Sequence, residues 1–146
     1  TGVAARASGV DNDLRRDFFD IYEIARFRPA LETSGDVLAR LRVRFFEFEE
    51  AARLSTEFVH NLPTEAVLVG NSEAQEGFAL GYAEGWRGHI LYWVRTNKDG
   101  TIDRCKIVDP SFRNWQGLAF CVLGEIIPDF PVCNKSFDLS YSGNDL

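Results

Sequence analysis

The sequence contains no methionine, only three cysteines and only two histidines among 146 residues. Because the chain opens on Thr1-Gly2 and not on an initiator methionine, we expect it to be a piece of a longer polypeptide that folds as one domain over residues 1–146. The cysteines, Cys105, Cys121 and Cys133, include no Cys-x-x-Cys pair, so the ligand count for a zinc or iron–sulfur site is not met. A reducing compartment is the simplest interpretation of three unpaired cysteines.

Other absences narrow the class of function. No apolar run approaches the ~18 residues that span a bilayer, and nothing resembles a signal peptide. No Gly-x-Gly-x-x-Gly pattern follows a strand-like run, so direct dinucleotide binding is not indicated. The net charge of -6 argues against nucleic-acid binding, which needs clustered Lys and Arg. The one basic cluster is followed at once by acids, so we interpret it as a solvated or subunit-facing helix surface: Arg40, Arg42 and Arg44, then Glu47, Glu49 and Glu50.

Twelve Phe, three Trp and four Tyr supply ample material for a core. Residues 1–35 look irregular, with a short helical or loop segment over residues 13–27. Asp36 is a plausible N-cap for a helix over residues 37–60, which Pro63 prevents from continuing. Six apolar residues at helical spacing predict its buried stripe: Leu38, Leu41, Phe45, Phe48, Ala52 and Val59.

The middle of the chain has the pattern of an antiparallel meander. Apolar residues alternate over residues 78–83, strand formers fill 89–95, the turn signal Asn97-Lys98-Asp99-Gly100 follows, and alternation returns over 101–108. A short helix is predicted from Asn71 or Ser72 to Gly77, and another from Pro110 to about Leu123 behind the N-cap Asp109. The second helix would bury Phe112, Trp115, Ala119 and Val122, and Pro128 with Pro131 predicts an extended tail. The fold class is therefore α+β: a long helix and shorter helices packed with a three-stranded antiparallel meander.

Five segments carry a more specific signal through their composition and their order. They are Thr1-Gly2 to Gly9 with Asp13-Leu14-Arg15; Gly35-Asp36 with Arg40 and Arg44; Glu84-Gly85-Trp86-Arg87-Gly88; Asp109-Pro110-Ser111-Phe112 with Asn114; and Asp138-Leu139-Ser140-Tyr141-Ser142-Gly143. Together they resemble the C-terminal part of the large subunit of nickel–iron hydrogenases and of the homologous 49-kDa-type subunit of complex I. The nearest sub-type is the energy-converting, formate hydrogenlyase-like branch, in particular its relatives that lack the C-terminal nickel cysteines.

In hydrogenases the last segment reads Asp-Pro-Cys-x-x-Cys, and the two thiolates hold nickel. Here Ser140 and Gly143 stand at the two cysteine positions. A hydroxyl is a poor ligand for a soft metal and glycine offers none, so the resemblance implies a degenerate site without the nickel–iron cluster. We expect no cofactor in this fragment and an iron–sulfur cluster in a partner subunit.

The resemblance further implies a subunit of a membrane-associated NADH-quinone oxidoreductase or energy-converting hydrogenase-like complex. Such a subunit would sit peripherally on the cytoplasmic face of the inner membrane, beside a small iron–sulfur subunit and membrane subunits, with quinone as a candidate ligand. The alternative is a non-catalytic scaffold that binds an iron–sulfur partner. The fragment alone is expected to be inactive, and in isolation it could form oligomers.

Arg87 and Asp138 are the candidate catalytic residues. The resemblance places the matching arginine over the metal site and the matching aspartate beside it, so we expect the two to form an ion pair lining a residual pocket. Ser140 and Tyr141 are further candidates for quinone or proton handling. The competing interpretation is that Arg87 is a turn residue, Asp138 a surface acid, and the tail purely structural.

Overall fold

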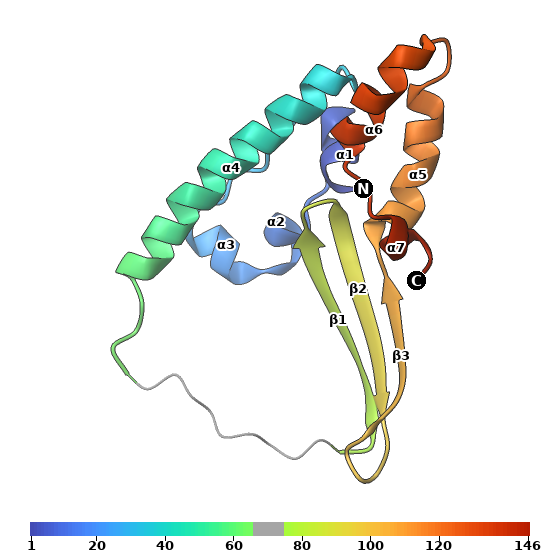
Figure 1. Cartoon of the computed structure of the whole chain (residues 1–146). Helices are drawn as coiled ribbons and strands as arrows, with labels where there is room; N and C mark the ends of the chain where they lie inside the picture. The colour runs from blue at the N-terminus through green and yellow to red at the C-terminus, as the bar shows by residue number, and fades with distance from the viewer. Residues whose placement is uncertain (66–74) are drawn as a thin grey trace.

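The computed structural model describes residues 1–65 and 75–146 (Figure 1). A long helix, α4, runs diagonally past a three-stranded sheet, and α1, α5 and α6 gather near its N-terminal end. The elements are α1 (Gly2–Ala7), α2 (Leu14–Phe18), α3 (Asp20–Ile24), α4 (Val37–His60), β1 (Gly77–Gly85), β2 (Gly88–Thr96), β3 (Ile102–Val108), α5 (Pro110–Cys121), the 3-10 turn η1 (Ile127–Asp129), α6 (Phe130–Phe137) and α7 (Tyr141–Asn144).

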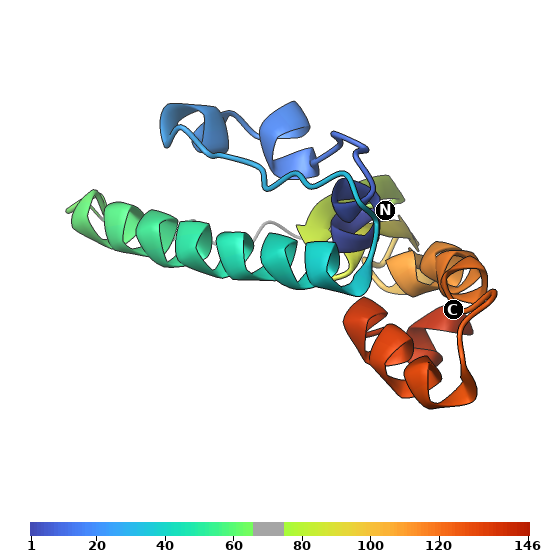
Figure 2. The same ribbon diagram turned by 90° about the horizontal axis from the view of Figure 1, so that it is seen from above.

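The long helix has the predicted bounds and the predicted cap. The Asp36 carboxylate accepts a hydrogen bond from the Ala39 N–H at 2.7 Å, which satisfies a backbone donor that has no partner within the helix. Seen from above, α2 and α3 lie on one side of α4, and α5, α6 and α7 lie beyond its N-terminal end (Figure 2).

The predicted buried stripe of this helix is wrong. Phe48 is 70% exposed, and the other members of the stripe are exposed too. The buried face lies instead along Ala39, Arg40, Val43, Glu50 and Leu54. The small apolar residues of this face pack against α1. Its charged residues, Arg40 and Glu50, have hydrogen-bond partners, which offsets the cost of burying them. The buried face of α4 is therefore not its most apolar face. The prediction of a solvated or subunit-facing surface fails for Arg40, which is 2% exposed.

The antiparallel meander is confirmed, in the order β1-β2-β3. A two-residue turn, Trp86-Arg87, joins β1 to β2, and Gly85 pairs with Gly88. Most of β1 is exposed, so the sheet projects away from the helices except at the end that carries this turn, where Tyr82 packs on Phe18 and Phe19.

Three further predictions need correction or lie outside the described residues. Residues 2–7 form a helix instead of an irregular segment. In α5 the predicted stripe is only partly right, because Trp115 and Val122 are half-buried while Phe112 is 59% exposed. The helix predicted from Asn71 or Ser72 to Gly77 lies outside the described ranges up to residue 74; its last residues, 75–77, are not helical, and Gly77 begins β1.

The tail is helical and not extended. Pro128 and Pro131 occupy first-turn positions of η1 and α6, where the missing N–H of proline breaks no helical hydrogen bond. Two small cores result: one holds α1 against α4, and the other holds α5 against α6 through Leu118, Cys133 and Phe137. Within the described residues, no helix is long and apolar enough to cross a membrane.

Candidate functional site

The turn that carries Arg87 is fixed against the start of the chain. Gly2 and Gly88 both have positive φ, at 58° and 132°. A Cβ at Gly2 would lie 2.4 Å from the Arg87 carbonyl oxygen, and one at Gly88 would lie 2.3 Å from the Thr1 Oγ1. Both positions therefore require glycine, which lets the backbone of the turn approach α1 closely.

Asn114, from α5, holds the same turn from another side. Its Nδ2 donates to the Arg87 carbonyl oxygen at 2.9 Å, and its Oδ1 accepts from the Thr1 amine at 2.8 Å. The side chain is buried, so neither group exchanges freely with water. Asn114, one of the motif residues, therefore positions Arg87 by binding its backbone.

Asp138 ends α6 in the left-handed conformation, with φ 54° and ψ 45°, which aspartate tolerates better than most residues. Arg87 Nη2 lies 3.7 Å from its Oδ2, and Arg87 Nε donates to its backbone carbonyl. The two residues are 31% and 27% exposed. The structure thus brings Arg87 and Asp138 together, as the sequence-based hypothesis required; their catalytic role stays a prediction.

Two further donors hold the Asp138 carboxylate. Lys135 Nζ donates to Oδ1 at 2.7 Å, and Trp86 Nε1 donates to Oδ2 at 3.0 Å. The hydrogen bond from Lys135, followed by that from Trp86 and the charges of Lys135 and Arg87, lowers the pKa of Asp138 below its ordinary value. Asp138 is consequently an anion at neutral pH, suited to orienting donors and poorly suited to donating a proton.

Arg44 completes this site, although sequence analysis assigned it only to a motif and to a solvated or subunit-facing helix surface. Its guanidinium lies over the Trp86 ring at 4.6 Å, and Nη2 donates to the Ser136 and Phe137 carbonyls at 3.2 and 3.1 Å. Burial lowers the pKa of Arg44, although the negative charge of Asp138 opposes this. Its Nη1 is buried and has no hydrogen-bond partner among the described residues.

A mainly apolar cavity of about 510 Å³ opens beside these side chains. Asp138, Arg44 and Trp86 line it, but Arg87 does not. The expectation that both members of the ion pair would line one pocket therefore holds for Asp138 alone. The remaining lining residues come from α4 and α6: Val37, Leu41, Val132, Lys135 and Ser136.

The two positions that match nickel cysteines serve the start of α7. The Ser140 Oγ accepts from the Gly143 N–H at 3.0 Å, which is an N-cap, and the Ser140 N–H donates to Ser111 Oγ at 3.0 Å. A Cβ at Gly143 would lie 2.5 Å from Asp109 Cγ, so a cysteine there would require Asp109 to move. A hydroxyl and a glycine do not form the soft donor set that a nickel–iron cluster needs.

Tyr141 lies apart from the ion pair. It is 68% exposed, its ring packs on Trp115 with centroids 5.4 Å apart, and its hydroxyl accepts a long hydrogen bond from Asn134 at 3.4 Å. In this structure the contacts of Ser140 and Tyr141 are structural, and their chemical role stays a prediction.

A buried ionic cluster joins two of the motif segments to Glu47 of α4. Arg6, 1% exposed, lies 3.1 Å from Asp13 Oδ2 and 3.0 Å from Glu84 Oε1, and also pairs with Glu47. Arg15 approaches Asp13 at 2.7 Å and Glu47 at 2.9 Å, so these two acids are shared. Sequence reasoning missed the cluster because residues so far apart in the chain give no local pattern.

Two more groups approach Glu84: the Leu14 N–H, which donates to its Oε2 at 3.3 Å, and the His89 ring. His89 Nε2 lies 3.2 Å from the Glu84 Oε2, within ion-pair range, yet no hydrogen bond of acceptable geometry forms at that nitrogen. We regard the contact as a close approach, since angle matters as much as distance in a hydrogen bond. The carboxylate of Glu84 therefore depends mainly on Arg6 for compensation.

The comparisons with known proteins agree with this architecture. Residues 1–76 and 69–145 match the family described as respiratory-chain NADH dehydrogenase, 49 Kd subunit. The chain is 32% identical over 146 residues to formate hydrogenlyase subunit 5 of Escherichia coli, covering 99% of this chain and 26% of that protein. It is 30% identical to the carbon monoxide-induced hydrogenase of Rhodospirillum rubrum, covering 94% of this chain and 38% of the relative.

Two more proteins extend the comparison. NADH-quinone oxidoreductase subunit 4 of Thermus thermophilus is 28% identical, over 94% of this chain and 41% of its own length. A chain in the structure of an archaeal respiratory membrane complex, the membrane-bound sulfane sulfur reductase, superposes with a TM-score of 0.87 and 24% identity. That likeness covers 100% of this chain and 42% of the other, and it establishes the fold. The chain belongs to the family of the 49-kDa subunit of respiratory-chain NADH dehydrogenase, and it spans less than half the length of these relatives.

Proposed function

We propose that the chain is part of a large subunit in a membrane-associated oxidoreductase complex of the NADH-quinone oxidoreductase and energy-converting hydrogenase type. Relatives named as subunits of formate hydrogenlyase and of NADH-quinone oxidoreductase support this proposal. In it, membrane subunits and a small iron–sulfur subunit are the partners, the iron–sulfur cluster belongs to that small subunit, and association is peripheral, on the cytoplasmic face. The nickel site is degenerate.

One observation supports a remaining role at the site: the Arg87–Asp138 pair persists although Ser140 and Gly143 supply no thiolate. Three elements contribute to holding the pair, namely the β1–β2 turn, α5 through Asn114, and the end of α6. Holding a cation and an anion partly buried and close together costs desolvation, which a purely structural turn does not require.

The substrate class that suits the neighbouring cavity is a quinone. A quinone headgroup is an apolar ring with two carbonyl acceptors, and the cavity of about 510 Å³ combines apolar walls with few polar groups. Arg44 lines it and has one buried donor nitrogen without a partner among the described residues. In this proposal Arg44 donates to a headgroup carbonyl, and Asp138 holds Lys135 and Trp86 in place.

The scaffold function is the second candidate, and different observations favour it. Ser140 caps α7 and Tyr141 packs on Trp115, so the tail residues already have structural contacts. Several large apolar side chains of α4 are exposed, as expected of a surface that contacts the rest of a longer subunit or its partners.

Turnover of the purified complex carrying Asp138→Asn distinguishes the two. The amide keeps the size of the side chain and an acceptor for Trp86, but it removes the charge that holds Lys135 and Arg87. We expect at least about a tenfold loss of quinone-linked turnover with assembly intact. Asp145→Asn, at an exposed acid near the end of the chain, is the matched control. Unchanged turnover in Asp138→Asn would favour the scaffold and contradict a chemical role for the site.

A further inference from the structure

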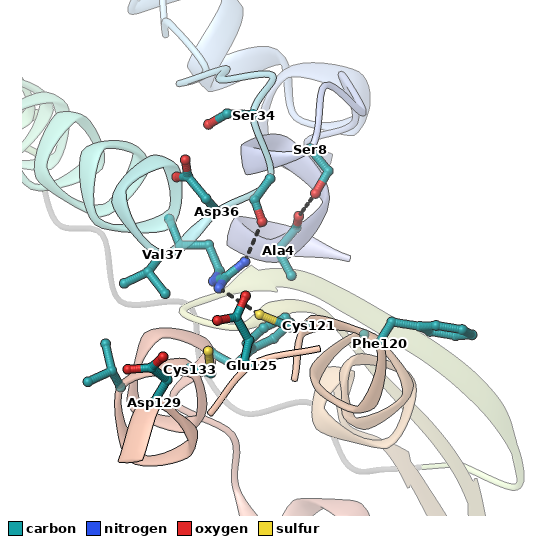
Figure 3. Close-up of a pocket in the computed structure, with 15 residues that line it drawn as sticks. Ala4, Ser8, Ser34, Asp36, Val37, Phe120, Cys121, Glu125, Asp129 and Cys133 are labelled. Carbon is teal, nitrogen blue, oxygen red and sulfur yellow. Dashed lines mark hydrogen bonds between the residues drawn. The ribbon is translucent and has the colours of Figure 1, made fainter. Parts of the chain in front are cut away.

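A second cavity, of about 640 Å³, lies between α1, α4, α5 and α6 and contains two of the three cysteines (Figure 3). Cys121 ends α5, and Cys133 belongs to α6. Both belong to the small core between these two helices, in which Cys133 is 5% exposed and Cys121 is half-buried. Cys105, on β3, is exposed.

Arg40 gives this cavity its unusual electrostatics. The Arg40 side chain is 2% exposed, and its guanidinium carbon lies 4.3 Å from the centroid of the Phe137 ring. Its hydrogen bonds run to Ser136 Oγ at 2.9 Å, to the Gly35 carbonyl at 2.6 Å and to Cys121 Sγ at 3.3 Å. Of these three acceptors, only the sulfur can become an anion.

No carboxylate lies within 4.0 Å of the Arg40 guanidinium in residues 1–65 and 75–146. Burying an unpaired cation is costly, and neutral acceptors offset that cost only in part. Three carboxylates, those of Asp36, Glu125 and Asp129, line the same cavity farther from the guanidinium (Figure 3). A thiolate at Cys121 would be the anion in direct contact with it, and an adjacent arginine is a recognised environment for reactive cysteines.

Cys133 has the opposite character. Burial, followed by the influence of the neighbouring Cys121 thiol, raises the pKa of the Cys133 thiol, so this residue stays protonated. A metal site is not the better interpretation of the pair, because the described residues contain no cluster of three metal-binding side chains and the guanidinium repels a cation. The two sulfurs of this cavity therefore differ in their surroundings: Cys121 contacts the Arg40 guanidinium, and Cys133 is buried.

We propose that Cys121 is an oxidation-sensitive thiol that reacts with hydroperoxides and is then resolved by Cys133, forming a reversible disulfide between α5 and α6. In the first step the Cys121 sulfur attacks a peroxide oxygen. The S–O bond forms, the O–O bond breaks, and the leaving hydroxide takes up a proton to give water. Cys121 is then a sulfenic acid, oxidised by two electrons.

In the second step the Cys133 sulfur attacks the sulfenic sulfur. The S–S bond forms, the S–O bond breaks, and hydroxide leaves with the Cys133 proton as a second water. One hydrogen peroxide is consumed for each disulfide, and a dithiol reductant reverses the reaction. Oxidation removes the sulfur acceptor from Arg40, which also binds Ser136, close in sequence to Asp138 on the same helix end.

The test is made on the complete subunit in its purified complex, with hydrogen peroxide as the oxidant and peptide mass spectrometry as the readout. We expect a Cys121–Cys133 linked peptide that dithiothreitol removes, with Cys105 still reduced. Cys133→Ser should instead accumulate a sulfenic acid at Cys121 that dimedone traps. Absence of the linked peptide, or oxidation of Cys105 with Cys121 intact, would overturn the proposal.

The role of Arg40 is tested by measuring the rate at which hydrogen peroxide oxidises Cys121. In the wild-type complex, Cys121 should react about tenfold faster in the native state than after unfolding in urea, where all three thiols become equivalent. Arg40→Met should abolish that advantage, whereas Arg42→Met, at an exposed arginine of the same helix, should preserve it. Equal native and unfolded rates for wild-type Cys121 would contradict the activation even if Arg40→Met fails to fold.

Discussion

Replacing Arg6 by methionine tests the buried ionic cluster. Methionine keeps much of the side-chain length but removes the cation that contacts Asp13, Glu47 and Glu84. Asp13 and Glu47 would retain Arg15, whereas Glu84, 1% exposed, would retain no arginine, only the Leu14 N–H at 3.3 Å and the close approach of His89. Breaking a buried ion pair by removing one partner costs about 3–5 kcal/mol, because it leaves an uncompensated charge. We expect a loss in that range.

The free energy of unfolding is measured in urea, which adds no ionic screening. The matched control is Arg16→Met, since Arg16 also contacts two carboxylates, Asp11 and Asp17, but at the surface. Exposed pairs contribute about 0–1 kcal/mol, so the control should change little. Combining Arg6→Met with Glu84→Gln should recover part of the loss, because a neutral amide leaves no stranded charge. Equal small effects from Arg6→Met and Arg16→Met would refute the reasoning.

Three further predictions concern stability. The hydrogen bond from Arg53, with those from Arg28, lowers the pKa of Glu50 from 4.5 to about 2. The Glu50 carboxylate should therefore stabilise the fold above pH 4.5 and lose that effect as the pH falls toward 2. The free energies of unfolding of wild type and Glu50→Gln in urea should converge over that interval, and a constant difference between them would contradict the prediction. Gly143→Ala should lower the free energy of unfolding by about 1–3 kcal/mol, because its Cβ would collide with Asp109. Gly81→Ala, which has open space around its Cβ, should lower it less. Thermal unfolding compares the two variants, and the reverse order would contradict the packing described for Gly143. Asn114→Ala should cost about 1–3 kcal/mol by leaving the Arg87 carbonyl unpaired, and Asn134→Ala, which loses only a long bond to Tyr141, should be nearly neutral in the same assay.

Local patterns predicted the elements of this fold well. Asp36 and Asp109 cap the two helices that the sequence assigned to them, and the meander follows the alternation of apolar residues. These features depend on contacts between residues near in sequence, which a single sequence reports directly. The tail was mispredicted because Pro128 and Pro131 start helical turns as readily as they extend a chain.

Burial was harder to predict than secondary structure. The most apolar face of α4 is exposed, and Arg40 is buried instead. The periodicity of apolar residues predicts that one face of a helix is buried, but it does not show whether the segment that buries it belongs to these 146 residues. A chain that spans less than half the length of its relatives leaves that question open to sequence reasoning.

Part of the candidate site was also predicted from the sequence, and part of it was not. Resemblance identified Arg87 and Asp138, and the structure places them together. Trp86 and Arg44 were missed as partners of the site because they reach it from the β1–β2 turn and α4, through contacts distant in sequence. Lys135 was missed although it lies only three residues before Asp138, a local spacing that could have indicated the pair. Ser140 and Tyr141 were chosen for their chemistry, and their observed contacts are a helix cap and a packed ring.

The most direct test of the central claim is the nickel content of the complete complex, purified without chelator and measured against protein. The proposed resemblance matches Ser140 and Gly143 to the two nickel cysteines, so we expect no stoichiometric nickel and iron only in partner clusters. Stoichiometric nickel would mean that other ligands replace the lost thiolates, and it would contradict the degenerate site.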